Sequence, residues 1–315
     1  MAPSKIDVHH HVLPQFFRDA QSAGGYPSTA YRAFPDWTPE TSLALMDRLD
    51  IRTAVLSFSA PGIYFGDAAV TRDLARRCND YLAECVARYP GRFGGFASLP
   101  LPDVDAALRE AARALDELQL DGIVHLTQTA NRYAGCPEYQ PVYEELNRRR
   151  AVVFIHPTYA PKSAEEGYVV PRPVVDYPGE STRAVTNLVF TGTLERNRDI
   201  RFVISHAGGM LPFIAHRIAI FDDLTPHRKN YPEGVMPYLR RLYYDTALSG
   251  DPVVLDTLLR LVGPSQILFG TDYPYVPDAT AERETRVTDA YPGFDAAARA
   301  RVERENAWGL FPRLA

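Results

Sequence analysis

The sequence predicts an α/β protein of the (β/α)8 class, the TIM barrel, and three features indicate this fold. Short runs of apolar and β-branched residues alternate with longer segments of helical spacing, and eight such pairs occur. The 315 residues suit one barrel with insertions. Chemically reactive side chains collect at the ends of the apolar runs, where barrel enzymes carry their sites. We therefore expect residues 1–315 to form a single domain, and an open doubly wound sheet is the alternative.

The expected strands are nearly continuous in apolar residues, as is usual for strands that are buried on both faces. The segments between them start with helix-capping residues, such as Thr38 before Pro39 and Asp251 before Pro252. After Asp103, apolar residues recur at helical spacing up to Leu118. The eight expected strands are 5–9, 52–59, 92–99, 122–127, 151–156, 201–206, 242–246 and 266–271.

Two segments do not fit the repeat, and both are expected to be loop insertions. Residues 14–37 follow the first strand and are rich in Gly, Pro, Ser and aromatic residues, and residues 159–179 follow the fifth strand and contain several prolines. Both leave from carboxyl ends of strands, where barrel enzymes build their pockets. We expect them to act as lids or pocket walls; plain surface loops are the alternative.

Composition excludes several classes of function. The net charge of −5 and the absence of a basic cluster argue against a nucleic-acid partner. No apolar run reaches the roughly 18 residues of a membrane span, and the first strand is expected to begin at Lys5, too early for a signal peptide. Three scattered cysteines do not form a disulfide framework. We therefore expect a cytoplasmic protein with small buried thiols.

Histidines and one aspartate predict a metal site at the strand ends. His9 and His11 lie two residues apart on the first strand, so alternation places both on one face and His10 on the other. His156, His206 and Asp272 end the fifth, sixth and eighth strands, and in a barrel these ends converge. Three imidazoles and a carboxylate suit one divalent metal, zinc best, with manganese, cobalt or iron as alternatives. The fourth expected strand has no lysine that could be carboxylated to bridge two metals, and its His125 is expected to be structural or part of a pocket wall.

These motifs resemble the amidohydrolase superfamily. IDVHHHVLP, FIHPT, SHAGG and FGTDYP are most similar to the branch of decarboxylases related to aminocarboxymuconate-semialdehyde decarboxylase. Within it, DWTPETSLALMDRL, AVLSFSAPG, HAGGMLPFIAHR, YYDTALS and the terminal LFPRL resemble the 6-methylsalicylate decarboxylases. This resemblance covers nearly the whole chain.

The resemblance implies a role for each candidate residue. His9, His11, His156 and Asp272 would be metal ligands, and His206 would stand beside the metal. Because Asp272 is close to the metal, we also expect it to be the catalytic acid, with His206 orienting it or relaying the proton. Arg217, eleven residues after His206, matches an arginine that grips a substrate carboxylate, in some relatives across a dimer interface. A homodimer is therefore expected.

The implied reaction is decarboxylation of a small anionic aromatic acid of the 2-hydroxybenzoate type. Direct loss of CO2 would leave an unstable aryl carbanion. A hydroxyl ortho to the carboxylate allows the ring carbon to be protonated first, after which CO2 leaves and aromaticity returns. Metal-dependent hydrolysis of an ester, lactone, amide or C–C bond uses the same residues and remains an alternative. A non-catalytic binding protein is a third possibility, although structural zinc sites are usually rich in cysteine.

Overall fold

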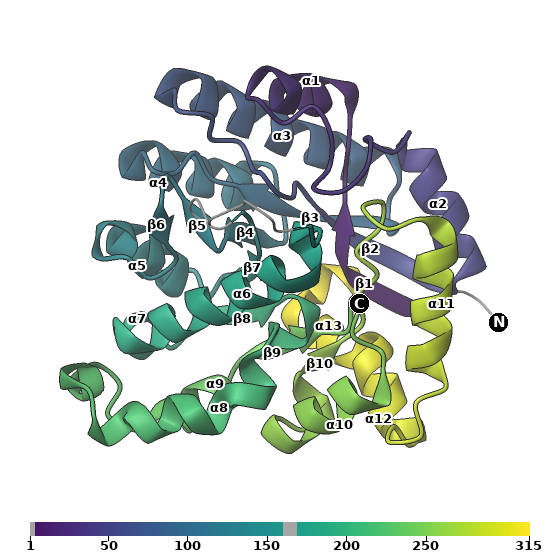
Figure 1. Ribbon diagram of the computed structural model, residues 1–315. Coiled ribbons are helices and arrows are strands. Elements are labelled where there is room, and N and C mark those ends of the chain that lie inside the picture. The colour runs from purple at the N-terminus through teal and green to yellow at the C-terminus, as the bar shows by residue number, and fades with distance from the viewer. Residues whose placement is uncertain (1–3, 160–168) are drawn as a thin grey trace.

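The computed structural model describes residues 4–159 and 169–315, and within them eight parallel strands form one sheet (Figure 1). Their order in the sheet is β1-β2-β3-β4-β7-β8-β9-β10, so each strand pairs with its neighbour along the chain. The predicted fold class is confirmed. The strands are β1 (Lys5–His11), β2 (Ile51–Ser57), β3 (Phe93–Ser98), β4 (Gly122–Leu126), β7 (Val152–His156), β8 (Arg201–Ile204), β9 (Tyr243–Asp245) and β10 (Ile267–Leu268).

Backbone hydrogen bonds between β1 and the segment after β10 bring the two edges of the sheet together. Val8 N–H donates to the Phe269 carbonyl at 3.0 Å, and Asp272 N–H donates to the His9 carbonyl at 2.8 Å. His11 N–H donates to Tyr273 at 2.7 Å. A closed sheet has no free edge, and its strand ends surround one mouth. The candidate residues on β1, β7 and after β10 are therefore neighbours.

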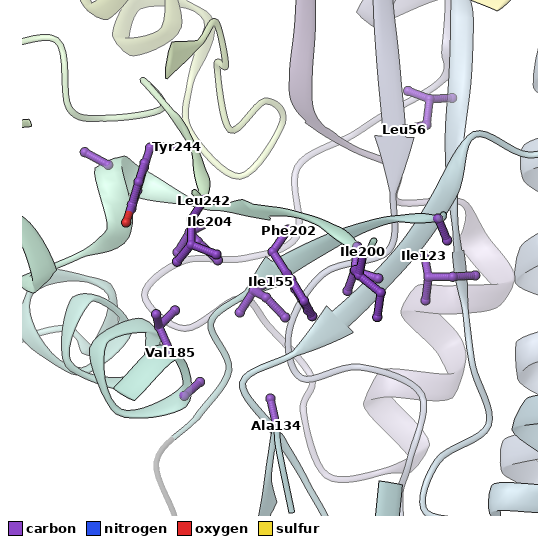
Figure 2. Close-up of a cluster of buried hydrophobic side chains, with 14 of the residues drawn as sticks. Leu56, Ile123, Ala134, Ile155, Val185, Ile200, Phe202, Ile204, Leu242 and Tyr244 are labelled. Atoms are coloured by element: carbon purple, nitrogen blue, oxygen red, sulfur yellow. The ribbon is translucent and has the colours of Figure 1, made fainter. Parts of the chain in front are cut away.

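Helices surround the strands and cover their outer faces (Figure 1). Outward-facing residues such as Ile155 on β7 and Ile204 on β8 pack with Val185 of a helix in this layer (Figure 2). A two-stranded hairpin, β5 (Gln128–Thr129) and β6 (Arg132–Tyr133), follows β4. The α-helices are α1 (Gln15–Ala23), α2 (Pro39–Arg48), α3 (Ala68–Arg88), α4 (Val104–Ala112), α5 (Gln140–Arg148), α6 (Arg172–Phe190), α7 (Thr193–Arg196), α8 (Leu211–Ile220), α9 (Val235–Arg240), α10 (Pro252–Leu261), α11 (Asp278–Asp289), α12 (Ala296–Ala300) and α13 (Asn306–Leu310).

A second cluster of apolar side chains fills the barrel interior. Inward residues such as Ile6, Val8 and Phe154 pack with Leu310 of α13 and with Phe311. Burial of these aliphatic and aromatic side chains stabilises the fold by roughly 25 cal/mol for each Å² of apolar surface removed from water. The C-terminal segment thus packs against the interior residues of the strands. This packing leaves the carboxyl ends of the strands available for polar side chains.

The two expected insertions are only partly loops. Residues 14–37 include the helix α1, and the last residues of 159–179 form the start of α6, which begins at Arg172. Pro173 occupies the first turn of α6, where a missing N–H costs nothing, so proline there is compatible with a helix. The middle of the second insertion, residues 160–168, lies outside the described residues.

No helix in the part of the chain that the structure describes is both long and apolar enough to cross a bilayer. This agrees with the absence of a long apolar run in the sequence.

Candidate metal centre

A register shift in β1 directs its two ligand-type histidines into the barrel. Between Asp7 and His10 the pairing with β2 slips, so residues 7 and 10 face residues 54 and 56. Such a bulge reverses the alternation of side chains along a strand. Val8 packs in the barrel interior, and the ring of His9 also lies inside, 5.0 Å from the ring of Phe154. The ring of His11 is 4.9 Å from that of His9.

His206 and Asp272 both have a left-handed backbone conformation. The φ angle is 53° at His206 and 63° at Asp272, a region that residues other than glycine rarely occupy. Each residue stands just past the end of its strand, β8 or β10, where the chain turns away from the sheet. This strained backbone at two candidate residues is typical of functional sites.

The structure brings the predicted metal-ligand set together. One ligand-type atom from each of four residues lies within 4.8 Å of the other three: His9, His11, His156 and Asp272. The Nε2 atoms of His9 and His11 are 3.0 Å apart, and Oδ1 of Asp272 lies 3.3 Å from the first and 3.2 Å from the second. The ring of His206 lies beside this group, 4.7 Å from the ring of His9. The whole group is buried.

The protonation pattern of His156 leaves an unsatisfied lone pair in the site. Its Nδ1 lies 2.8 Å from the carbonyl oxygen of Pro157, which can only accept, so Nδ1 carries the hydrogen. Nε2 then has a lone pair, and this buried atom has no hydrogen-bond partner among the described residues. A buried acceptor without a donor is unfavourable by about 1–3 kcal/mol. A cation at the centre of the group would satisfy it.

The other two histidines present the same pattern. Nδ1 of His9 donates to Oδ2 of Asp245 at 2.8 Å, and Nδ1 of His11 lies 2.9 Å from the hydroxyl and 3.3 Å from the carbonyl oxygen of Ser57. The Nε2 atoms of both rings therefore point at each other and at the carboxylate of Asp272. Three imidazole nitrogens and one carboxylate oxygen are the ligands that zinc and similar divalent metals prefer. The residues present thus fit one metal ion.

The electrostatics of the group also favour a positive charge at its centre. Burial alone would lower the pKa of His9, but the charges and hydrogen bonds of Asp245 and Asp272 outweigh burial and raise it to about 10. Burial would raise the pKa of Asp272, but its bonds to His11 and His9 hold it well below the usual range. Burial lowers the pKa of the other rings, and neutral rings are the form that binds metal: His11 (to about 4), His156 and His206.

Asp245, at the end of β9, is a functional candidate that the sequence analysis missed. Its Oδ2 holds Nδ1 of His9, and its Oδ1 accepts the backbone N–H groups of His206 and Ala247 at 2.8 and 3.0 Å. A carboxylate behind a metal-binding histidine fixes the ring and raises its basicity. The sequence contains a feature that could have indicated Asp245: it is the single acidic residue in the largely apolar run LYYDTALS.

Asp7 is a second missed residue. Its carboxylate accepts from the hydroxyl of Thr271 at 2.6 Å and lies 2.9 Å from Nδ1 of His10. Nε2 of His10 contacts the hydroxyl of Ser42 on α2 at 2.8 Å. His10 therefore faces away from the site, as predicted, and its network ties β1 to the segment that carries Asp272.

Comparison with known proteins assigns this arrangement to a family. The sequence pattern of the family described as Amidohydrolase matches residues 6–313. The chain belongs to the amidohydrolase family. A 6-methylsalicylic acid decarboxylase of Aspergillus aculeatus is 40% identical over 98% of this chain and 96% of its own length. The predicted resemblance to this decarboxylase branch is thereby confirmed.

Two solved structures share the fold of this amidohydrolase. A 2,6-dihydroxybenzoate decarboxylase in complex with 2,6-dihydroxybenzoate is 26% identical, with a TM-score of 0.85 and coverage of 98% of this chain and 99% of the other. A dihydroxybenzoic acid decarboxylase from Polaromonas, with bound manganese and the inhibitor 2-nitroresorcinol, is 24% identical. Its TM-score is 0.84, with coverage of 98% and 97%.

A cavity of about 500 Å³ opens onto the candidate metal centre of this amidohydrolase. His156, His206 and Asp272 line it, together with the aromatic rings of Tyr31, Tyr159, Tyr177 and Tyr275. Described residues of both expected insertions are therefore pocket walls. Among the described lining residues there is no lysine or arginine.

Two other predicted residues lie outside the metal group. His125 stacks on Tyr143 and is held at both ring nitrogens, by the Leu126 carbonyl at 2.7 Å and the Tyr143 hydroxyl at 3.1 Å, which fits the predicted structural role. Arg217 is exposed on α8 and is not among the residues that line the 500 Å³ cavity. Within one copy of the chain it therefore does not line this cavity, and its substrate role remains a prediction.

Proposed function

We propose that this chain is a metal-dependent decarboxylase that releases CO2 from a small 2-hydroxybenzoate such as 6-methylsalicylate. The observation that carries the proposal is the convergence of His9, His11, His156 and Asp272 beside a cavity that two of them, His156 and Asp272, line together with aromatic rings. The relationship to decarboxylases of 6-methylsalicylic and 2,6-dihydroxybenzoic acid supports the reaction and the ring class.

His9, His11, His156 and Asp272 would hold the metal. A divalent metal in this place would supply the positive charge that attracts the oxygens of an anionic substrate and fixes its orientation. Zinc is our first choice because three ligands are imidazoles, and manganese is the second. Asp245 would keep the hydrogen of His9 on Nδ1, so that Nε2 remains available.

Asp272 would move the proton that the reaction needs. With its low pKa it is a carboxylate in the free protein, so it can accept the phenolic proton of the bound substrate. It then donates this proton to the ring carbon that bears the carboxylate. The C–C bond breaks, its electrons return to the ring, and CO2 leaves. The phenolate product recovers a proton from solvent.

His206 is suited to pass a proton from solvent to the phenolate product. Its Nδ1 is 3.1 Å from the carbonyl of Ala247, which fixes the hydrogen on Nδ1 and leaves the Nε2 lone pair free. Burial lowers its pKa, so the ring is neutral at pH 7 and can pass a proton between solvent and the site.

We also propose that the enzyme is a cytoplasmic homodimer. Large apolar side chains are exposed along α8 and just after it, including Phe213 (85% exposed) and Leu224 (68% exposed). Such a surface is typical of a protein–protein contact. Arg217 is exposed on the same helix and would act on a second copy. The free cysteines Cys78, Cys85 and Cys136 suit a reducing compartment.

The test is a turnover assay with protein loaded separately with zinc and with manganese. We expect CO2 and the matching phenol from 6-methylsalicylate or 2-hydroxybenzoate, and no reaction with benzoate, which lacks the ortho hydroxyl. Hydrolysis of aryl esters or lactones without CO2 release from any hydroxybenzoate would instead assign the site to a hydrolase. Metal binding without either reaction would contradict both.

A further inference from the structure

The hydroxyl of Tyr275 is a polar group in the cavity that the reaction described above does not use. Tyr275 lines the same cavity as Asp272 and His156. Its ring stands edge-on to the ring of His11, with centroids 5.2 Å apart, so it is next to the metal group. The hydroxyl oxygen is buried and has no hydrogen-bond partner among the described residues.

Three other hydroxyls that line this cavity already donate to backbone carbonyls. A hydroxyl that donates to a backbone carbonyl has no second hydrogen to offer a ligand. Three of the lining hydroxyls donate in this way: Thr29 to the Arg32 carbonyl at 2.7 Å, Tyr31 to the Tyr275 carbonyl at 2.5 Å and Ser249 to the Ala247 carbonyl at 3.0 Å. The bond from Tyr31 also fixes the backbone of Tyr275.

A tyrosine hydroxyl keeps its proton at neutral pH, so that of Tyr275 offers a hydrogen-bond donor. The side chains of Gln21 and Ser59 are close to it, but neither forms a hydrogen bond with it within the described residues. A buried donor of this kind is unfavourable unless a ligand supplies an acceptor.

The substrate requires such donors. An aromatic acid brings a carboxylate with two oxygens into a cavity that has no lysine or arginine among its described lining residues. A buried carboxylate needs hydrogen bonds on the oxygen that does not face the metal group. We infer that the Tyr275 hydroxyl donates a hydrogen bond to the substrate carboxylate and selects carboxylates over neutral phenols. This inference rests on the proposed function.

This hydrogen bond would also make the protein bind its substrate more tightly than its product. Loss of CO2 removes the acceptor, so the phenol product leaves Tyr275 unpaired again and binds more weakly. A hydrogen bond to a charged acceptor contributes about 1.5–3 kcal/mol, so its loss weakens binding by roughly 10- to 100-fold. Tyr275→Phe should therefore weaken the binding of the unreactive carboxylate benzoate by that factor and leave the binding of phenol unchanged.

The experiment is titration calorimetry of the zinc-loaded protein with benzoate, which carries the carboxylate but lacks the ortho hydroxyl that the reaction needs, and, separately, with phenol. The matched control is Tyr273→Phe, which removes a hydroxyl from the same segment; Tyr273 contacts His10 and does not line the cavity. We expect only Tyr275→Phe to weaken binding, and only for the carboxylate. Equal losses for both ligands, or no loss for either, would overturn the inference. Because binding is measured without turnover, failure of the decarboxylase proposal would be seen separately in the CO2 assay.

Discussion

Asp245 accepts a hydrogen bond from Nδ1 of His9 at 2.8 Å, and neither side chain is exposed to solvent. The two residues are 236 positions apart in the chain. Their contact joins the last residue of β9 to the first strand and orients a histidine of the candidate metal group. The first prediction follows from this pair.

Asp245→Asn should lower metal affinity by about 10- to 100-fold, because its NH2 group would face Nδ1 of His9 and, as a donor, cannot hold the hydrogen on that atom. The amide oxygen can still accept from the backbone of His206 and Ala247, so the fold should persist. The measurement is metal content after dialysis against buffered zinc, with the circular dichroism spectrum as a check on folding. Wild-type zinc affinity in the variant would contradict this role.

Gly270→Ala should displace His9 and lower both stability and metal content. A Cβ atom at residue 270 would lie 2.8 Å from Cβ of His9 and 3.3 Å from Cβ of Asp245, so these side chains must move. Overpacking of this kind lowers the free energy of unfolding by about 1–3 kcal/mol. The matched control is Gly309→Ala in α13, where a Cβ would meet no atom within 4 Å. Thermal unfolding with and without zinc measures both effects. Equal melting temperatures for the two variants would refute the steric argument.

Asp272→Asn should reduce the rate of CO2 release by at least about 100-fold, because an amide cannot carry a proton from the phenol to the ring carbon. The variant is assayed at a zinc concentration that saturates it, so that metal loss and loss of proton transfer are separated. A saturated variant that releases CO2 at the wild-type rate would remove Asp272 from the mechanism.

Phe213→Glu should convert the proposed dimer to a monomer, because a buried carboxylate at a dimer interface is unfavourable. Sedimentation velocity measures the change.

Arg217→Ala should leave the dimer intact and raise the KM for 2-hydroxybenzoate, because the guanidinium of Arg217 would contact the substrate carboxylate bound in a second copy of the chain. A wild-type chain that is monomeric and fully active would exclude this arrangement.

The stability of the metal-free protein should fall as the pH drops from 6.5 to about 4, and His125 should account for part of the loss. Burial lowers the pKa of His125 from 6.5 to about 4 in the folded state. Over this interval the unfolded chain binds the proton and the folded chain does not, so acid favours unfolding by up to about 1.4 kcal/mol per pH unit. In His125→Asn, the free energy of unfolding measured with urea should depend less on pH over this interval. Identical pH slopes for variant and wild type would disprove the assignment.

Much of the site was predictable because barrel geometry converts strand ends into neighbours. Two histidines at the end of the first strand, one at the end of the fifth and an aspartate after the eighth had to meet once the fold was correct. In the structure, one potential ligand atom from each of these four residues lies within 4.8 Å of the other three. The metal itself, the single-domain organisation and the dimer stay predictions.

Other features depend on tertiary contacts that no local pattern encodes. The register shift between Asp7 and His10 places Val8 and His9 on the same side, which simple alternation does not give. The expected strand 266–271 contracts to β10 (Ile267–Leu268), because the chain leaves the sheet before Asp272 takes its left-handed conformation. The partners of Asp245 come from distant elements, so its role appears only when the barrel is closed.

The most direct test of the central claim is the rate of CO2 release from 6-methylsalicylate as metal is added back to chelator-treated protein. We predict no release from the metal-free protein and a linear rise that ends at one equivalent per chain, with His11→Ala and His156→Ala flat throughout. Full activity in protein shown to contain no metal would contradict the account.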